Sequence, residues 1–479
     1  MSDTAIVWFR RDLRLYDNPA LHHARTEFAC IVPVFILAAE EDEPWPPGAA
    51  SRWWLHHSLE ALGRDLTRSG SHLALYRGDS LSVLMMLCQR HGASAVYWNR
   101  LYEPAAVIRD ERVAKALHSV GIRSRSFPGH LLREPDDVTT GSGTPYEVFT
   151  PYSRASLRLG DPGEPLAAVD PGAAPDNRVH DDGLERLGLL PRIRWDHGLS
   201  QCWRSGEAAA WRSLERFIDC CADDYGEARD RPSMDATSRL SPHLHFGEIS
   251  PRSLWHAVRR AMAGRRRESA ADPFLRQLLW RDFAHQLLYH NPHIAQDNFK
   301  PAFDAFPWRD SPEIAQAWRE GKTGIPLVDA GMRELWHTGF MHNRVRMNAA
   351  SFLTKNAGIH WLAGARWFWD TLVDADLANN TMGWQWVAGS GPDAAPYFRV
   401  FNPASQGRRF DPRGEYLRRW LPELAGLPDE HIHEPWLAPG DLLSRAGIQL
   451  GRSYPAPILD LKATRQRALE AYRRNVRGR

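Results

Sequence analysis

Residues 374–403 combine carboxylates, amides, indoles and an arginine in one short stretch. The side chains that stand out are Asp374, Asp376, Asn379, Asn380, Trp384, Trp386 and Arg399. A plain core segment does not mix large aromatic rings with carboxylates so densely, because buried charges are costly without partners. These residue types suit a site that holds a flat, polar, redox-active ring.

A second candidate site is a hydroxyl-rich turn just before Pro242. It consists of Thr237, Ser238, Arg239, Leu240 and Ser241. Hydroxyls, backbone N–H groups and an arginine are the groups that bind a pyrophosphate, particularly at the N-terminus of a helix. The same residue types also begin ordinary helices, so the turn alone leaves both interpretations open.

A helix predicted over 272–290 brings Gln277, Trp280 and Arg281 onto one face, because they lie three or four residues apart. An amide, an aromatic ring and a cation on one face suit a pocket that stacks on a base and hydrogen-bonds it. An amphipathic helix with a tryptophan in the core has the same spacing, and that alternative stays open.

The segment 340–347 adds further polar groups, among them Asn343 and Arg344. Arg344 and Arg399 suit contacts with phosphates. His243 and His245 are spaced like a pair of metal ligands, but no third ligand follows at a suitable spacing. We therefore interpret both as histidines of a helix turn and predict no metal.

Composition indicates a soluble globular protein of two or three domains. Of 479 residues, 25% are charged and 43% hydrophobic, and 60 Lys and Arg oppose 58 Asp and Glu. Because the net charge is only +2, any nucleic-acid site has to be a local patch. Residues 460–479 hold seven Lys or Arg and two acids, a net of 7 − 2 = +5. They form either a solvated helix face or such a patch.

The five cysteines have no spacing typical of a metal site, which favours a reduced, cytoplasmic setting. The first residues lack the basic and apolar regions of a signal peptide. No run of about 18 apolar residues occurs, so we expect no membrane span.

The first 130 residues alternate predicted strands and helices. Strands are predicted at 5–9, 30–36, 72–76, 95–98 and 122–127, with helices such as 52–67 and 106–120 between them. This order is typical of a doubly wound parallel sheet, which binds ligands at the carboxyl ends of its strands. No GxGxxG follows the first strand, so the ordinary dinucleotide fingerprint is missing. We predict an α/β domain over 1–130.

Residues 131–200 are rich in Pro, Gly and Asp, and we predict a long interdomain linker on the surface there. Helical periodicity dominates the rest of the chain. Helices are predicted at 207–221, 251–263, 272–290, 311–320, 326–338, 344–355 and 360–373. We therefore predict an all-α second domain over 201–479.

Four long strings resemble the photolyase/cryptochrome family. They are WFRRDLRLYDNPAL (8–21), TSRLSPHLHFGEISP (237–251), EGKTGIPLVDAGMRELWHTGFMHNRVRM (320–347) and the stretch 374–403. Within the family, the group of class I cyclobutane-pyrimidine-dimer photolyases is the most similar. The resemblance implies an N-terminal α/β antenna domain and a C-terminal helical domain that holds FAD.

The resemblance also assigns residues to the cofactor. The FAD phosphates and ribityl chain would be held by Tyr225, Thr237, Ser238, Arg239, Leu240 and Ser241. The isoalloxazine ring would be held by Asn343, Arg346, Asp374 and Asp376, with Asn380 facing flavin N5. Trp280 and Arg281 would lie beside the cofactor or the damaged base. A neutral amide such as Asn380 hydrogen-bonds the ring without adding a negative charge.

For the reaction, the resemblance implies an electron-transfer triad of Trp384, Trp361 and Trp308. Trp386, Trp280, Gln277 and Met347 would line the lesion site. The DNA backbone would meet Arg229, Arg344 and Arg399. The implied activity is light-driven repair of UV-damaged DNA, in which an electron from photoexcited reduced FAD splits a flipped-out pyrimidine dimer.

Two alternatives stay open. Gln277 stands where class I enzymes carry Glu and is more typical of (6-4) photolyases, whereas Met347 and the string HNRVRM lack the histidine of those enzymes. A cryptochrome-type light receptor without repair activity is the other alternative. Against it stand Asn380, an amide typical of photolyases, and the short segment after Pro457.

The antenna chromophore is left open as well. Family contacts to methenyltetrahydrofolate include an Asn-Glu pair, but here Tyr102 and Glu103 are followed by Pro-Ala-Ala. Methenyltetrahydrofolate bound differently, 8-hydroxy-deazaflavin, another flavin and an empty cleft all fit this departure. We expect the protein to act as a monomer.

Overall fold

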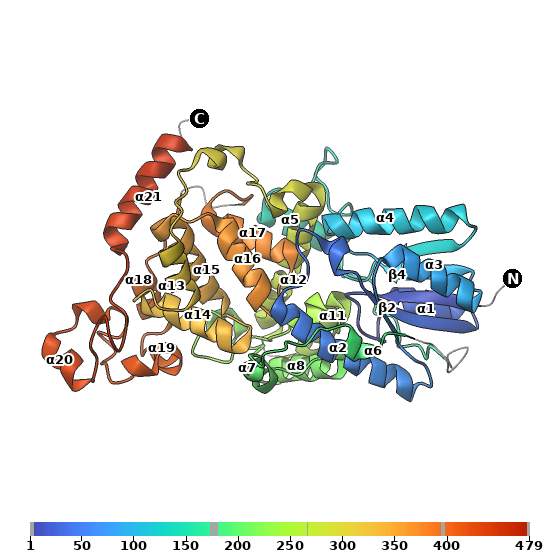
Figure 1. Cartoon of the computed structure of the whole chain (residues 1–479), viewed down its shortest axis with the longest axis horizontal. Helices are drawn as coiled ribbons and strands as arrows, with labels where there is room; N and C mark the ends of the chain where they lie inside the picture. The colour runs from blue at the N-terminus through green and yellow to red at the C-terminus, as the bar shows by residue number, and fades with distance from the viewer. Residues whose placement is uncertain (1–3, 173–180, 266, 394–397, 477–479) are drawn as a thin grey trace.

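We analysed a computed structural model of the chain, which describes residues 4–172, 181–265, 267–393 and 398–476. An α/β part with the N-terminus lies at one end, and a larger helical part with the C-terminus lies at the other (Figure 1). No helix in the described residues is both long and apolar enough to cross a bilayer.

The α/β part is built on one parallel sheet. Its strands are β1 (Thr4–Phe9), β2 (Cys30–Leu37), β3 (Ala74–Arg77), β4 (Ala95–Asn99) and β5 (Arg123–Phe127). They pair in the order β3-β2-β1-β4-β5, and every pair is parallel. The central strand β1 is buried along its whole length, as its continuous apolar sequence requires. The predicted doubly wound sheet is confirmed.

Helices cover both faces of this sheet, and each face has its own apolar core. These helices are α1 (Pro19–Glu27), α2 (Ala49–Arg68), α3 (Ser80–His91) and α4 (Pro104–Ser119), with the 3-10 helix η1 (Ala39–Asp42) after β2. The carboxyl ends of β1 and β4 meet where the strand order reverses, which is the usual place for a ligand in such sheets.

The rest of the chain is helical, and the predicted all-α second part is confirmed. Its α-helices are α5 (Phe149–Arg158), α6 (Gly183–Arg186), α7 (His197–Cys202), α8 (Glu207–Cys220), α9 (Tyr225–Ala228), α10 (Ser241–His245), α11 (Pro251–Met262), α12 (Asp272–His290), α13 (Pro312–Arg319), α14 (Pro326–Thr338), α15 (Asn343–Ser351), α16 (Trp361–Thr371), α17 (Leu377–Ala388), α18 (Pro403–Phe410), α19 (Glu415–Trp420), α20 (Gly440–Arg445) and α21 (Leu461–Asn475). Short 3-10 helices are η2 (Glu268–Ala271), η3 (Pro292–Ala295), η4 (Pro301–Ala305), η6 (Pro422–Leu424) and η7 (Pro435–Leu437).

One predicted helix differs in kind from the observed one. The sequence predicts a single helix over 344–355, whereas α15 ends at Ser351 and continues as a π-helix, η5 (Phe352–Ala357). Gly358 ends it with φ of 76°, a conformation that favours glycine. A π-turn is invisible to a 3.6-residue pattern, because its side chains are offset by one residue.

The predicted linker region contains a helix that packs into the core. In α5, Phe149 and Tyr152 are buried, and Phe149 stacks on Trp280 of α12 with ring centroids 3.5 Å apart. Part of this region therefore supports the helical part instead of running over the surface. The residue limits 1–130, 131–200 and 201–479 stay predictions.

Two of the family-like segments, 8–21 and 237–251, lie against each other where the α/β part meets the helical part. Leu13 N–H donates to the Phe246 carbonyl at 3.1 Å. A Cβ on Gly247 would lie only 2.1 Å from the Arg11 carbonyl oxygen, so a glycine is required there. Trp54 Nε1 donates to Glu248 at 3.1 Å. The α/β part thereby fixes the segment that carries α10.

Candidate functional site

Helix α17 presents one partly open side in an otherwise buried helix. Asp376 caps its N-terminus, accepting hydrogen bonds from Asn379 N (2.9 Å) and Asn379 Nδ2 (2.7 Å). Asn380 is half-buried, and a Cβ placed on Gly383 would meet no atom within 4 Å. Trp384, on the inward side, is only 3% exposed. The open side therefore offers amides and backbone, not bulk, to a flat ligand.

An ion pair joins the segment just before this helix to α15, and the same carboxylate bonds the hydroxyl-rich turn. Arg346 Nη2 lies 3.1 and 3.0 Å from the two oxygens of Asp374, and Ser241 Oγ donates to the same carboxylate at 2.7 Å. The side chains of Asp374 and Arg346 are 5% and 24% exposed. Removing either partner would leave a poorly solvated charge.

The hydroxyl-rich turn lies ahead of α10 and holds a strained residue. Arg239 has φ of 53°, and its Nε donates to Asp235 at 3.1 Å. The guanidinium groups of Arg239 and Arg346 lie 5.5 and 5.2 Å from the ring centre of Phe340. Phe340, to which the sequence assigned no task, thus holds two predicted cofactor-binding cations side by side.

Tyr225 is buried against Phe217 and Phe274, with ring centroids 5.4 and 5.5 Å away. Thr237 and Ser238 are half-buried, Ser241 is exposed, and Leu240 is buried. Hydroxyls and an arginine therefore line the accessible side of the turn. This donor set suits phosphate oxygens.

In α12, only two of the three residues predicted to bind a base remain available together. Gln277 is half-buried, and its Nε2 donates to the Pro273 carbonyl at 3.0 Å. One face of Trp280 is covered by Phe149. Arg281 is buried and donates to the carbonyl and Nε2 of His130, at 2.6 and 2.7 Å. Gln277 and Trp280 therefore stay together, while the Arg281 guanidinium is committed to the α/β side.

On α15, the exposed Asn343 and the half-buried Met347 lie one turn apart, with Asn343 Nδ2 3.9 Å from Met347 Sδ. Helices α12 and α15 each pack against α17. Their partly open residues therefore come from three adjoining helices, as a shared site requires.

A buried cluster behind Asp376 escaped the sequence analysis. Asp376 Oδ2 lies 3.5 Å from His245 Nδ1 and 3.4 Å from His285 Nε2. Although burial raises the pKa of Asp376, His285 and His245 hold it well below its usual range. His285 Nδ1 donates to the Arg281 carbonyl at 3.0 Å, so its other nitrogen faces the carboxylate. The carboxylate that caps α17 thus faces two buried imidazoles on its inner side.

The two histidines interpreted as helix-turn residues are in fact partnered. Both are buried in α10, His243 bonding Glu248 and His245 facing Asp376. Their carboxylate partners lie 5 and 131 residues away, so only the nearer one was within reach of a local pattern.

His130, His285 and Asp376 place one ligand atom each within 4.8 Å of one another, which is the geometry of a possible cation site. Arg281 already donates to His130 Nε2 from 2.7 Å. A guanidinium in contact with a would-be ligand opposes a metal cation there. The absence of a metal stays a prediction.

The three tryptophans of the expected triad come from α17 (Trp384), α16 (Trp361) and the segment before α13 (Trp308). The ring of Trp384 lies 2.1 Å from where a Cβ on Gly364 would be, and Trp361 precedes Gly364 by three residues on the same helix. His360 lies between Trp361 and Trp308, with ring centroids 5.5 and 4.9 Å away. Trp384 and Trp361 are buried, whereas Trp308 is partly exposed. This order leads from the buried side of α17 toward solvent.

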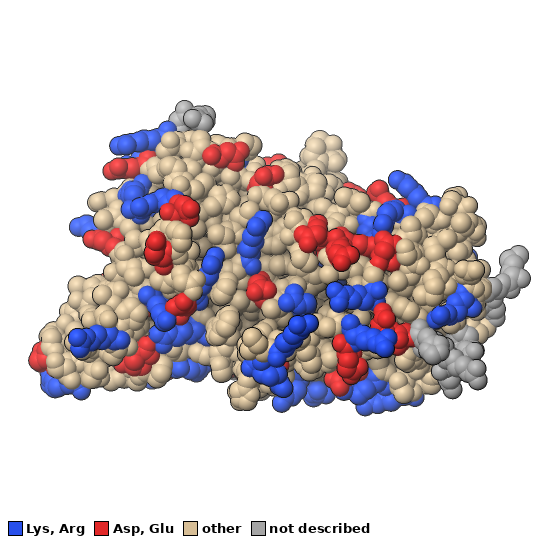
Figure 2. Space-filling model, viewed as in Figure 1, with Lys and Arg blue, Asp and Glu red and all other residues tan. Residues whose placement is uncertain are grey.

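The predicted DNA-facing residues come from several elements. Arg344 lies in α15 and Trp386 in α17, whereas Arg229 follows α9 and Arg399 precedes α18. Arg344 pairs with Asp230 at 2.7 Å, and Arg229 lies over the Tyr225 ring at 5.3 Å. Trp386 is half-buried and donates from Nε1 to the Asp393 carbonyl at 3.0 Å, and Arg399 is exposed. Figure 2 shows basic and acidic side chains interspersed on the visible face. A DNA site therefore has to be a local feature, as the net charge predicts.

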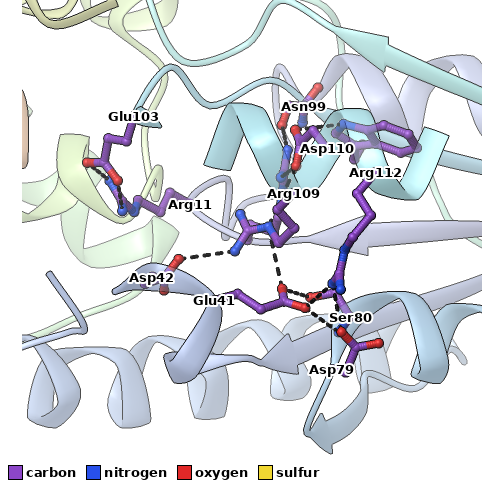
Figure 3. A network of polar contacts seen from close by, with 12 residues as sticks. Arg11, Glu41, Asp42, Asp79, Ser80, Asn99, Glu103, Arg109, Asp110 and Arg112 are labelled. Carbon is purple, nitrogen blue, oxygen red and sulfur yellow. Dashed lines mark hydrogen bonds and ion pairs between the residues drawn. The ribbon is translucent and has the colours of Figure 1, made fainter. Parts of the chain in front are cut away.

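The carboxyl edge of the sheet is crowded with charges of its own (Figure 3). Arg109 pairs with Asp42 at 3.1 Å, and Arg112 Nη2 lies 2.6 Å from both Glu41 and Asp79. Arg11 pairs with Glu103, and Arg10 with Asp110. Arg10 and Arg109 also lie over Trp8, 4.6 and 5.4 Å from its ring centre. These ion-paired side chains lie at the usual ligand position of such a sheet. The antenna chromophore, whose identity the sequence leaves open, stays a prediction.

Comparison with known proteins agrees with this geometry. Residues 5–171 match the family described as DNA photolyase, and residues 274–474 match the FAD binding domain of DNA photolyase. A deoxyribodipyrimidine photo-lyase of Agrobacterium fabrum is 46% identical, with 98% of this chain and 97% of the relative covered. Cryptochrome-1 of Arabidopsis thaliana is 38% identical, with 98% and 70% covered.

A bacterial class III photolyase from Agrobacterium tumefaciens has the same fold, with a TM-score of 0.94, 45% identity and coverage of 99% and 98%. The chain belongs to the photolyase/cryptochrome family. The predictions of a photolyase-type enzyme and of FAD as its cofactor are confirmed. The sequence pointed to class I within this family, whereas this solved relative is described as class III.

The residues around α17 fit FAD. Asn380 Nδ2 donates to the Ala365 carbonyl at 3.0 Å, which leaves the Asn380 carbonyl oxygen for a ligand. Asp374 has the Arg346 guanidinium as its partner, so this carboxylate adds little net charge beside a ring. Arg239 and the hydroxyls of its turn suit the phosphates. The individual contacts stay proposals.

Proposed function

We propose that this protein is a light-driven DNA repair enzyme that splits cyclobutane pyrimidine dimers. The observation that carries the proposal is the arrangement of α17. Its accessible side offers Asn380 and the open position at Gly383, its buried side holds Trp384, and its C-terminal turn carries the half-buried Trp386. One helix thereby adjoins the predicted cofactor, electron-supply and lesion positions.

When bound, reduced FAD supplies the electron that opens the cyclobutane ring under light and receives it back afterwards. The protein has to bring the dimer to that cofactor. Flipping two bases out of a duplex costs a few kcal/mol, and less for a damaged, poorly stacked pair. Trp386 and the uncovered face of Trp280 offer stacking surfaces, and the Gln277 amide both donates and accepts hydrogen bonds.

The Arg346–Asp374 ion pair and the Asp376 cap of α17 would position the cofactor. Arg346 is fixed by Asp374 and by its Nε bond to the Met341 carbonyl at 2.6 Å. Asp376, held by His245 and His285, keeps α17 capped and Asn380 in place. Because Asp374 is paired with Arg346, a negatively charged reduced ring meets less repulsion from that carboxylate.

We propose that three tryptophans, Trp308, Trp361 and Trp384, carry electrons from the solvent side to the cofactor. We propose that Arg229, Arg344 and Arg399 bind the phosphates of the DNA backbone, so DNA binding should weaken as the salt concentration rises. We expect the protein to work as a monomer in the cytoplasm.

Two other functions have specific support. Gln277 favours a (6-4) photolyase, since an amide replaces the expected carboxylate. Similarity to cryptochromes, including one from Synechocystis with a TM-score of 0.89 and 31% identity, is compatible with a light receptor.

A lesion panel distinguishes these functions. Photoreduced holoprotein is mixed with oligonucleotides that carry a cyclobutane dimer, a (6-4) product or no lesion, and is then illuminated. We expect restoration of the cyclobutane dimer alone. Restoration of the (6-4) product alone supports the second function, and restoration of neither, with FAD bound, supports the third.

A further inference from the structure

A small cavity lies beside the predicted DNA-facing residues, between the C-terminal end of α17, η4, η5 and α21. Its volume is about 110 Å³, which has room for several water molecules at about 30 Å³ each. Three cationic side chains line it, namely Lys300, Lys355 and Arg399, together with aromatic rings that include Phe398 and Tyr472. Among the residues that the structure describes, no acid lines it.

Lys355 is the unusual member of this lining. It lies in the π-helix η5 and is only 4% exposed. Its ammonium donates to the Arg399 carbonyl at 2.6 Å and lies 4.0 Å from the ring centre of Phe398. Among the residues that the structure describes, Lys355 has no ion pair. A buried ammonium without an anion is costly, so the cavity lacks the negative charge that would complete it.

The groups around Lys355 disfavour its charged form. Burial and then the nearby Arg399 lower the pKa of Lys355 to about 7, and no acid contributes. At the rim, Lys300 is exposed and lies within the influence of Asp393 and Glu147. Lys355 thus has no compensating acid in the described part of the chain, and an anion entering the cavity would favour its charged form.

The position of the cavity indicates where such an anion comes from. Trp386 and Arg399, both predicted to face DNA, line it directly. The C-terminal turn of α21 contributes Tyr472 to the lining and exposes Arg473 and Arg474 beside it. A polyanion drawn to this rim would bring a phosphate within reach of the inner lysine.

We propose that this cavity is a phosphate-binding subsite in which Lys355 and Arg399 hold one backbone phosphate of the DNA strand. The inference deepens the proposed function and rests on it for the identity of the strand. Its chemistry requires only a phosphate group.

The first test measures DNA binding by the FAD-loaded protein over a range of salt concentrations, using a duplex with one cyclobutane dimer. Lys355→Met and Ala302→Phe are compared with the wild type. The first removes the inner charge, and the second fills the cavity while leaving Lys355 and Arg399 in place. Each should weaken binding several-fold and reduce the slope of log affinity against log salt by about 1.

Lys462→Gln is the matched control, because Lys462 is exposed at the opposite end of α21 from the cavity. It should leave the slope nearly unchanged. If Lys355 only anchors the loop at Arg399, then Lys355→Met weakens binding but Ala302→Phe does not, and the subsite is refuted.

A second arm separates DNA phosphate from free phosphate. Inorganic phosphate is titrated at constant ionic strength while the melting temperature of the wild type and the two cavity variants is followed. Phosphate-dependent stabilisation of the wild type alone, with equal DNA affinity in all three, assigns the cavity to free phosphate and overturns the DNA assignment. No effect in either arm overturns the proposal entirely.

Repair is measured separately, at saturating DNA. If the wild type binds damaged duplex with the expected salt slope but repairs nothing, the proposed function fails while the phosphate subsite stands. If the variants repair normally once saturated, the subsite acts in binding and not in the reaction.

Discussion

The carboxyl edge of the sheet and the open side of α17 are both dense in charged and polar groups, yet they differ in how those groups are used. At the sheet edge, Arg11, Arg109 and Arg112 face acids of the same edge (Figure 3). Around α17, the charges are also paired, but Asn380 and the position at Gly383 stay open.

This difference teaches that polar density alone does not identify a binding site. The sheet edge has the position expected for a ligand in a doubly wound fold, but its guanidinium groups already have partners. The α17 site has fewer charges, and its amide oxygen and accessible backbone remain for a ligand. What distinguishes a site is the set of groups that the protein leaves unused.

The largest expected effect comes from breaking the ion pair beside α17. Asp374→Asn leaves the Arg346 guanidinium without its carboxylate. Because Arg346 is partly exposed, the cost should fall somewhat below the 3–5 kcal/mol of a fully buried pair. We expect FAD affinity to fall roughly 100-fold, which corresponds to about 2.7 kcal/mol. Titration of apoprotein with FAD measures this change.

Glu103→Gln is the matched substitution at the sheet edge, where it breaks the pair with Arg11. It should lower the melting temperature and leave FAD affinity near that of the wild type. Equal loss of FAD in both variants would contradict the distinction between the two regions.

The next effect concerns the inward face of α17. Trp384→Phe removes the first member of the proposed relay while keeping an aromatic ring against Gly364. Photoreduction of bound FAD should slow at least tenfold, since about 1.4 kcal/mol in a barrier changes a rate tenfold. Repair by chemically pre-reduced protein should persist. Trp54→Phe, in the core of the α/β part, should leave photoreduction unaffected.

Unlike the ion-paired cations of the sheet edge, Lys355 should make the stability of the protein depend on pH. Its pKa of about 7 lies below its ordinary value of 10.5, so the folded protein binds fewer protons than the unfolded chain between these pH values. Stability should therefore rise with pH above 7. Over two pH units this contribution is about 2 kcal/mol, from about 1.4 kcal/mol per unit.

Urea denaturation of wild type and Lys355→Met at pH 7 and pH 9 tests this contribution. The wild type should gain more stability than the variant between the two values. A parallel gain in both proteins would show that Lys355 does not lose its proton on folding.

The smallest effect is expected at the lesion side. Gln277→Glu restores the carboxylate that class I enzymes carry, and we expect repair yield to rise about twofold, or about 0.4 kcal/mol in relative barrier. The comparison uses a single dimer-containing oligonucleotide under limiting light. An unchanged yield counts against a lesion contact at this position.

Much of the fold follows from local sequence patterns. The buried run in β1 and the alternation with helices predict the parallel sheet, since central parallel strands read as continuous apolar runs. The site residues on α17 were recognisable because Asp376, Asn380 and Trp384 lie within nine residues. Their grouping needs no long-range information.

Other features depend on contacts between distant parts of the chain. Asp376 is held by His245 and His285, and Arg281 by His130, none of which is close in sequence. Lys355 appears in sequence as an ordinary charged residue of a predicted helix. Its burial arises from the π-helix and from packing of α21, and neither leaves a periodic signal.

The most direct test of the central claim is repair itself. Photoreduced holoprotein is incubated with an oligonucleotide that carries one thymine dimer, and restored thymines are counted per bound FAD in blue light and in darkness. We predict restoration in the light only. If the protein retains FAD and binds the oligonucleotide, but the dimer survives illumination intact, the claim that this site repairs cyclobutane dimers is contradicted.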